Sequence, residues 1–154
     1  MKSLVVYYSR TGTTKTVGKA IAKELKADLD EIIDLKKRLG PINWFIAASD
    51  ATRRKLTKIK VKKKPESYDM IIIGTPNWNK NIAPAVRTYL TDHNLDGKKV
   101  GFFCTSDNKN TKKLFEEMKK LISKSVGSLA VRAKEVKSGS YDEKVKSFVK
   151  SLKK

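Results

Sequence analysis

The segment of residues 9–14, SRTGTT, gathers four side-chain hydroxyls around one glycine directly behind an apolar run. Hydroxyls and backbone N–H groups bind phosphate oxygens well where a strand leads into a helix, because the helix N-terminus carries partial positive charge. Gly12 permits the tight backbone that lets such amides converge. The segment predicts a phosphate-binding loop, with the cation Arg10 inside it.

The spacing of the glycines excludes two nucleotide-binding motifs. The loop G-x-x-x-x-G-K-[ST] needs its glycines five residues apart, whereas Gly12 and Gly18 are six apart and no hydroxyl follows Lys19. The fingerprint G-x-G-x-x-G needs three glycines, and this segment has one. A structural alternative stays open, in which Thr13 or Thr14 only N-caps the helix and stabilises it by about 1 kcal/mol.

Alternating strands and helices are expected to position this loop. Runs of apolar and β-branched residues predict strands at residues 3–8, 30–35, 68–76, 98–106 and 127–133. Apolar residues at helical spacing predict helices from 14 to about 27, after Pro41, after Pro84, across 114–122 and across 145–152. The predicted fold class is α/β, a three-layer sandwich with a five-stranded parallel sheet and helices on both faces, in a single domain of residues 1–154.

Two more loops are expected beside the first. In a parallel sheet, ligands bind beyond the carboxyl ends of the strands, where the strand order reverses. The stretches TPNWNKN (residues 75–81) and TSDNKN (residues 105–110) follow the third and fourth predicted strands and are rich in small polar side chains. The segments 9–14, 75–81 and 105–110 are called the first, second and third loops below.

Trp44, Cys104 and His93 are assigned to structural positions. Trp44 lies in an apolar stretch and is expected in the core, and Cys104 ends a buried strand. His93 has no evident partner in a polar turn and is expected at the surface. One cysteine and one histidine allow neither an internal disulfide nor a multi-histidine metal site, so no metal is expected.

The chain is strongly basic, with 35 Lys and Arg against 16 Asp and Glu and a formal net charge of +19. Such a charge attracts acidic proteins, nucleic acid or anionic membranes. Eight of the cations fall in residues 53–64 (Arg53 to Lys64), which form either a solvated helix end and strand edge or a surface for an anionic partner. Apolar runs are far shorter than the roughly 20 residues of a membrane span, and no signal pattern opens the sequence, so a cytoplasmic protein is expected.

The three loops, in this order, resemble those of the flavodoxin family. Ser9, Thr11, Gly12 and Thr14 match its phosphate motif, and the stretches YDMIIIGTPNW and KKVGFFCTS match its third and fourth strands. The likeness covers nearly the whole chain. It implies the flavodoxin-like strand order 2-1-3-4-5 and the cofactor FMN, whose 5′-phosphate would occupy the first loop.

The resemblance also implies a role for each of the other loops. Trp78 would stack on the flavin ring, with packing over the sheet edge as its alternative, and the third loop would border the pyrimidine edge. Asn77 and Asn79 tolerate left-handed backbone conformations, which would let the second loop turn a peptide toward the ring. The cofactor-binding residues implied are Ser9, Arg10, Thr11, Gly12, Thr13, Thr14, Thr75, Pro76, Asn77, Trp78, Asn79, Thr105, Ser106, Asp107, Asn108 and Asn110.

Three function classes follow from these features. The first is an FMN-binding electron carrier with no catalytic side chain, whose redox partner proteins have acidic docking surfaces. Many flavodoxins carry a tyrosine in the third loop, but no aromatic residue lies between Phe103 and Phe115 here. One flavin face would be open, so an FMN-dependent oxidoreductase acting on a quinone or a similar planar acceptor is the alternative. The third class is an anion-binding or nucleic-acid-binding domain that keeps the fold without flavin.

Overall fold

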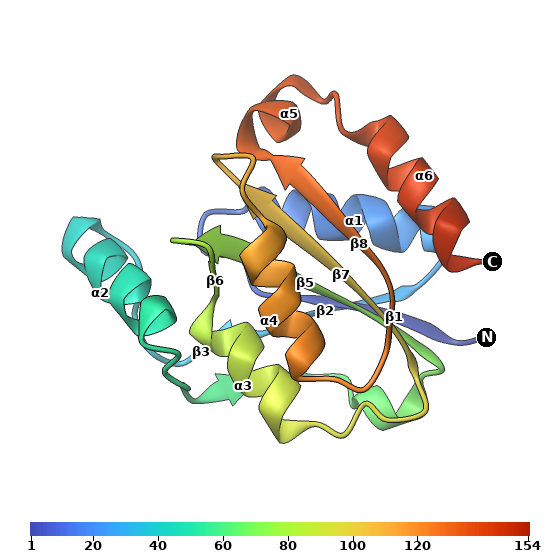
Figure 1. The fold of residues 1–154 in the computed structure, drawn as a ribbon, viewed down its shortest axis with the longest axis horizontal. Coiled ribbons are helices and arrows are strands. Elements are labelled where there is room, and N and C mark those ends of the chain that lie inside the picture. Colours follow the sequence, from blue (N-terminus) through green and yellow to red (C-terminus); the bar gives the residue numbers. More distant parts are fainter.

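Five parallel strands form the centre of the molecule, in a computed structural model that describes all residues, 1–154 (Figure 1). Their order across the sheet is β2 (Asp28–Glu31), β1 (Ser3–Tyr7), β5 (Met70–Trp78), β7 (Lys99–Ser106) and β8 (Ser125–Arg132). Counted along the chain, this order is 2-1-3-4-5. The predicted α/β class and strand order are therefore confirmed.

Helices cover both faces of this sheet (Figure 1). Successive residues of a strand point to opposite faces, so Val5 contributes to one buried cluster and Val6 to the other. Helices α1 (Thr13–Leu25) and α6 (Asp142–Leu152) belong to the first cluster, and α3 (Pro84–Asp92) and α4 (Lys112–Lys120) to the second. The continuous apolar strands are explained by this double covering.

Several short elements were not predicted. The expected strand 30–35 is divided, because β3 (Ile33–Asp34) leaves the main sheet and pairs antiparallel with β4 (Ile59–Lys60). β6 (Asn81–Ile82) folds back on the end of β5. The remaining short elements are η1 (Pro65–Ser67) and α5 (Ala133–Ser138). A carboxylate holds the segment after β4, since Asp30 Oδ2 accepts the N–H groups of Lys62 and Lys63 at 2.8 and 2.7 Å.

Helix α2 (Pro41–Thr52) forms where predicted but is oriented differently from the expectation. Its buried residues are the small or polar Ala47, Asp50 and Ala51, while its large apolar side chains are exposed. Trp44 is 47% exposed, so its prediction as a core residue is wrong. The physical reason is that Asp50 is drawn inward by Arg38, whose Nη1 donates to Asp50 Oδ2 at 2.9 Å.

Two further single-residue predictions have different outcomes. Cys104 is fully buried in the core, as predicted, and burial raises the pKa of its thiol to about 12. His93 is only half-buried, but it has a partner that the sequence did not reveal. Its Nδ1 lies 3.0 Å from the carbonyl oxygen of Tyr89, and the centroids of the His93 and Tyr89 rings are 4.3 Å apart.

Candidate functional site

The three loops meet at a pocket of about 480 Å³ beyond the carboxyl ends of β1, β5 and β7. The order of the strands reverses between β1 and β5. Parallel α/β sheets bind their ligands at such a point, so the pocket is a candidate ligand site. Its lining combines hydroxyl and amide side chains with two tryptophans. Such a lining suits a planar molecule that carries a polar or anionic group.

The first loop leaves the N-terminus of α1 without a side-chain cap. Gly12 is the N-cap residue, with a left-handed φ of 97°. No side chain accepts a capping hydrogen bond from the backbone N–H groups of the first turn. The alternative in which Thr13 or Thr14 caps the helix is therefore wrong. The backbone N–H groups of these two threonines have no partner in the protein and are available to an anion.

The hydroxyls of the first loop have separate tasks. Ser9 Oγ accepts the N–H of Gly12 at 3.1 Å and so holds the turn. Thr14 Oγ1 lies 2.7 Å from Thr105 Oγ1 and connects the first loop to the third. Thr11 and Thr13 line the pocket, and neither hydroxyl bonds to another protein atom. These two hydroxyls remain available to a ligand.

The second loop holds Trp78 at the end of β5. The Trp78 ring meets Tyr8 edge to face at a centroid distance of 5.6 Å, and the Arg38 guanidinium lies 6.0 Å from its centroid. Burial raises the pKa of Tyr8 to about 12, and the nearby Asp34 carboxylate adds to this effect. The Tyr8 side chain that packs against Trp78 is therefore a neutral phenol. Trp78 is partly buried against the core and also lines the pocket.

A two-residue turn joins β5 to β6 directly after Trp78. Asn79 and Lys80 have left-handed φ values of 50° and 64°, the conformation of a hairpin turn that follows the twist of the strands. The left-handed conformation allowed for Asn79 is present, whereas Asn77 keeps a strand conformation. The turn residue that the sequence did not reveal is Lys80.

Asn77 connects the second loop to the third. Its Nδ2 donates to Ser106 Oγ at 3.0 Å and to the carbonyl oxygen of Asn110 at 3.2 Å. Its Oδ1 is buried and has no hydrogen-bond partner in the protein. An unpaired buried acceptor in a pocket wall is costly unless a bound group donates to it.

All but three of the predicted site residues line this one pocket. The three exceptions, Gly12, Thr75 and Asn110, shape its walls. Thr75 is fully buried, and its hydroxyl donates to the carbonyl oxygen of Pro76 and accepts the N–H of Ala83. The remaining predicted residues are lining residues, namely Ser9, Arg10, Thr11, Thr13, Thr14, Pro76, Asn77, Trp78, Asn79, Thr105, Ser106, Asp107 and Asn108.

Four lining residues were missed by the sequence predictions. Trp44, Ala47 and Ala48 reach the pocket from α2, and Ala133 from the start of α5. A signal for α2 exists in the sequence: Ala47 and Ala51 lie one turn apart on a small-residue face, which is suited to close packing. Because Trp44 lies beside this face and not beside Ile42, helical geometry alone could have separated it from the other large apolar residues.

The three loops and the strand order agree with the resemblance seen in the sequence. The match to a family model decides which family the chain belongs to. The model described as Flavodoxin matches residues 2–152. The chain belongs to the flavodoxin family. No protein in the curated set matches the sequence significantly.

Solved structures of flavoproteins share the fold of this flavodoxin-family chain. A candidate flavoprotein of Bacteroides uniformis is 24% identical, with a TM-score of 0.80 and 97% of each chain covered. A flavoprotein of Lactobacillus acidophilus, solved in complex with FMN, is 25% identical with a TM-score of 0.72, covering 90% of this chain and 98% of its own. Oxidised flavodoxin 1 of Bacillus cereus is 20% identical with a TM-score of 0.57, covering 99% and 97%.

There is no group of three or more His, Cys, Asp or Glu side chains placed to hold a metal ion. None of the helices combines the length and the apolar character needed to span a lipid bilayer.

Proposed function

We propose that this flavodoxin-family chain binds FMN in the pocket and acts as an electron-transfer protein. The observation that carries the proposal is the uncapped N-terminus of α1, where free backbone N–H groups and the hydroxyls of Thr11 and Thr13 surround a position suited to a phosphate. The FMN complex of the related Lactobacillus protein supports the choice of anion.

The residues present fit the rest of the cofactor. Trp78 offers an aromatic surface at the pocket wall, and Tyr8 limits its movement by edge-to-face contact. The unpaired Asn77 Oδ1 is an acceptor for an N–H group of a bound ring. When bound, FMN would supply the transfer of electrons, so the task of the protein is to bind, orient and tune it.

The net charge supports a particular class of redox partner. At +19, the chain would attract partner proteins that have acidic docking surfaces, through long-range steering that salt weakens. The single cysteine is buried and free, which is in keeping with a reducing compartment such as the cytoplasm. We therefore propose a cytoplasmic carrier.

The phosphate loop can be tested by comparing FMN with riboflavin, which lacks the phosphate. We expect FMN to bind the purified chain at least tenfold more tightly, as followed by the quenching of flavin fluorescence. The double variant Thr11→Val/Thr13→Val should weaken FMN binding and leave riboflavin binding unchanged. A matched control is Thr16→Val, since the Thr16 hydroxyl bonds to the Gly12 carbonyl oxygen and lies outside the pocket.

Two results would count against this proposal. If the chain takes up no FMN, the proposal is overturned. If FMN and riboflavin bind with equal affinity, the first loop does not bind the phosphate. The oxidoreductase alternative keeps one observation in its favour, since no aromatic residue of the third loop lines the pocket. Steady-state oxidation of NAD(P)H with a quinone as acceptor would identify that activity.

A further inference from the structure

Helix α2 presents large apolar side chains to solvent. Leu39, Ile42, Phe45 and Ile46 are 68%, 77%, 69% and 37% exposed, and we call these four residues the α2 apolar surface. The last three follow helical spacing and therefore lie on one side of α2. Figure 1 shows this helix at the outer left edge of the molecule, beyond β6 and α3. The helix protrudes at this edge, and the four side chains stay exposed to solvent.

Positive charge flanks the α2 apolar surface on both sides in the sequence. Lys36 and Lys37 precede it, and the cations of residues 53–64 begin directly after α2. Lys37 and Arg53 are exposed and have no carboxylate partner. Between residues 35 and 64 the only acid is Asp50. An apolar patch flanked by cations with no exposed acid is therefore complementary to an anionic, partly apolar partner.

The two acids nearest the α2 apolar surface are turned inward. The Asp34 side chain is 2% exposed and pairs with Arg38, and the Asp50 side chain is 6% exposed. Asp50 accepts from Arg38 at 2.9 Å and from Lys36 Nζ at 2.6 Å. Neither carboxylate presents negative charge to an approaching partner. The exposed ionised groups of this region are all cations.

We propose that the α2 apolar surface docks reversibly on an anionic lipid bilayer. The apolar side chains would enter the boundary between headgroups and acyl chains, and the flanking cations would contact anionic headgroups, as in other interfacial helices. A protruding helix suits a deformable bilayer, whereas a protein partner would need a groove to receive it. A second copy of the chain is disfavoured, because two chains of +19 repel each other.

This docking does not depend on flavin and goes beyond the proposed function. The test is flotation of the full chain with vesicles of phosphatidylcholine, with and without phosphatidylglycerol, at low and at physiological salt. We expect binding to the vesicles that contain phosphatidylglycerol and little binding to phosphatidylcholine alone. Raising the salt concentration should weaken the binding, because the headgroup contacts are electrostatic.

Two double variants separate the apolar contribution from the electrostatic one. Leu39→Ser/Ile42→Ser removes two exposed side chains outside the pocket and should lower the vesicle partition coefficient at least about tenfold. Lys37→Gln/Arg53→Gln removes two flanking cations and should also lower it about tenfold or more. Both variants should keep wild-type circular dichroism and FMN affinity, which reports on the pocket independently.

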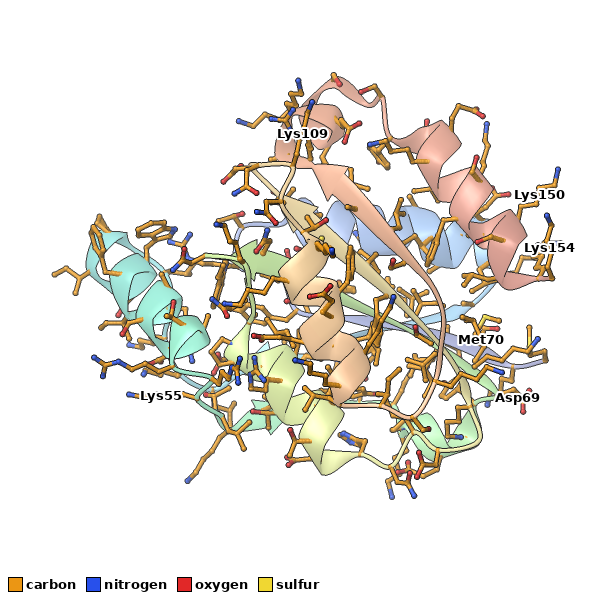
Figure 2. All side chains as sticks on the ribbon, in the orientation of Figure 1. Lys55, Asp69, Met70, Lys109, Lys150 and Lys154 are labelled. Atoms are coloured by element: carbon orange, nitrogen blue, oxygen red, sulfur yellow. The ribbon has the colours of Figure 1, made fainter.

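The matched control is Lys150→Gln/Lys154→Gln. These lysines are exposed, form no ion pair and lie at the opposite end of the molecule from α2 (Figure 2). The same loss of charge there should change the partition coefficient by less than about twofold.

Several outcomes would overturn the proposal. One is no binding to anionic vesicles, and another is equal loss of binding in the control and in the Lys37/Arg53 variant, which would mean unspecific charge attraction. Binding to poly-L-glutamate but not to vesicles would identify an acidic protein partner instead. Self-association that Leu39→Ser/Ile42→Ser abolishes, measured by light scattering, would identify a second copy of the chain.

Discussion

Trp78 and Trp44 line the same pocket but are held in different ways. Trp78 ends a central strand and packs against Tyr8, whereas Trp44 lies on the peripheral helix α2, with its ring edge to face with Phe45 at 5.1 Å. A surface held in place before binding loses less entropy when a ligand stacks on it. Trp78 should therefore contribute more to flavin binding than Trp44.

The variant Trp78→Ala should weaken FMN binding roughly 10- to 100-fold, since aromatic stacking on a base-like ring contributes about 1–3 kcal/mol. Trp44→Ala, the matched control, should weaken it less, and Trp78→Phe should restore most of the loss. Fluorescence titration of each variant measures these affinities. A larger loss in Trp44→Ala than in Trp78→Ala would contradict the assignment of the stacking surface.

At the scale of elements, the packing of the Phe103 ring of β7 against β5 requires a residue without a side chain at Gly74. The Phe103 ring of β7 lies where a Cβ on Gly74 would be, and the overlap involves the ring itself. Gly74→Ala should lower the free energy of unfolding by about 1–3 kcal/mol, because the ring must move within a packed core. Gly127→Ala is the control, since its Cβ would make only ordinary contacts at 3.5 Å or more. Chemical denaturation measures both, and equal stabilities would refute the steric explanation.

A buried carboxylate connects α3 and α4 to the chain after α2. Glu117 Oε2 accepts from Arg87 Nη2 at 2.8 Å, and Glu117 Oε1 accepts from Arg54 Nη2 at 3.0 Å. Burial alone would raise the pKa of Glu117, but the two guanidinium groups outweigh it and hold the pKa below its ordinary value of 4.5. This ion pair stabilises the fold above about pH 4.5, and the contribution is lost as the pH falls through the lowered pKa.

The variant Glu117→Gln should therefore be less stable at neutral pH, by about 3 kcal/mol, because the buried Arg87 loses its counter-charge. The exposed Arg54 loses its carboxylate partner as well, which contributes little. Its stability should also fall less than that of the wild type between neutral and acidic pH. Denaturant unfolding across this pH range tests both expectations. The exposed neighbour variant Glu116→Gln should behave like the wild type, and a pH dependence unchanged in Glu117→Gln would refute the role of this carboxylate.

The central elements could be predicted from sequence because their local patterns agree with their burial. The run MIII at the start of β5 reads as a doubly covered strand, and it is one. Hydrophobic spacing alone predicts the wrong buried face for helix α2, because a tertiary contact with Arg38 draws the charged Asp50 inward. The small residues Ala47 and Ala51 were the local signal of its buried face. The three polar loops were found because strand ends converge, whereas Trp44 was missed because it enters the pocket from α2.

The whole molecule carries a charge of +19, and this charge should act on any bound flavin. Reduction adds negative charge, which the positive potential of the protein stabilises. We expect the reduction of bound FMN to an anionic form to occur at a less negative potential than in an acidic flavodoxin, by on the order of tens of millivolts. Redox titration at low salt measures this value.

Salt and local variants provide the controls for this expectation. Added salt should reduce the difference in potential, and Lys80→Gln/Lys109→Gln in the second and third loops should lower the potential more than Lys150→Gln in α6. A potential equal to or below that of an acidic flavodoxin at low salt would contradict the expectation.

The inward-turned carboxylates of Asp34 and Asp50 also determine how the α2 end of the molecule responds to its surroundings. With both acids buried, the exposed ionisable side chains of residues 35–64 are lysines and arginines only. These residues include no histidine, the side chain that ordinarily changes its charge between pH 5 and 8. The electrical potential of this end is therefore nearly constant across the physiological pH range. A change of pH within this range would leave the attraction of this end for anions unchanged, and ionic strength would remain the one ordinary variable that adjusts it.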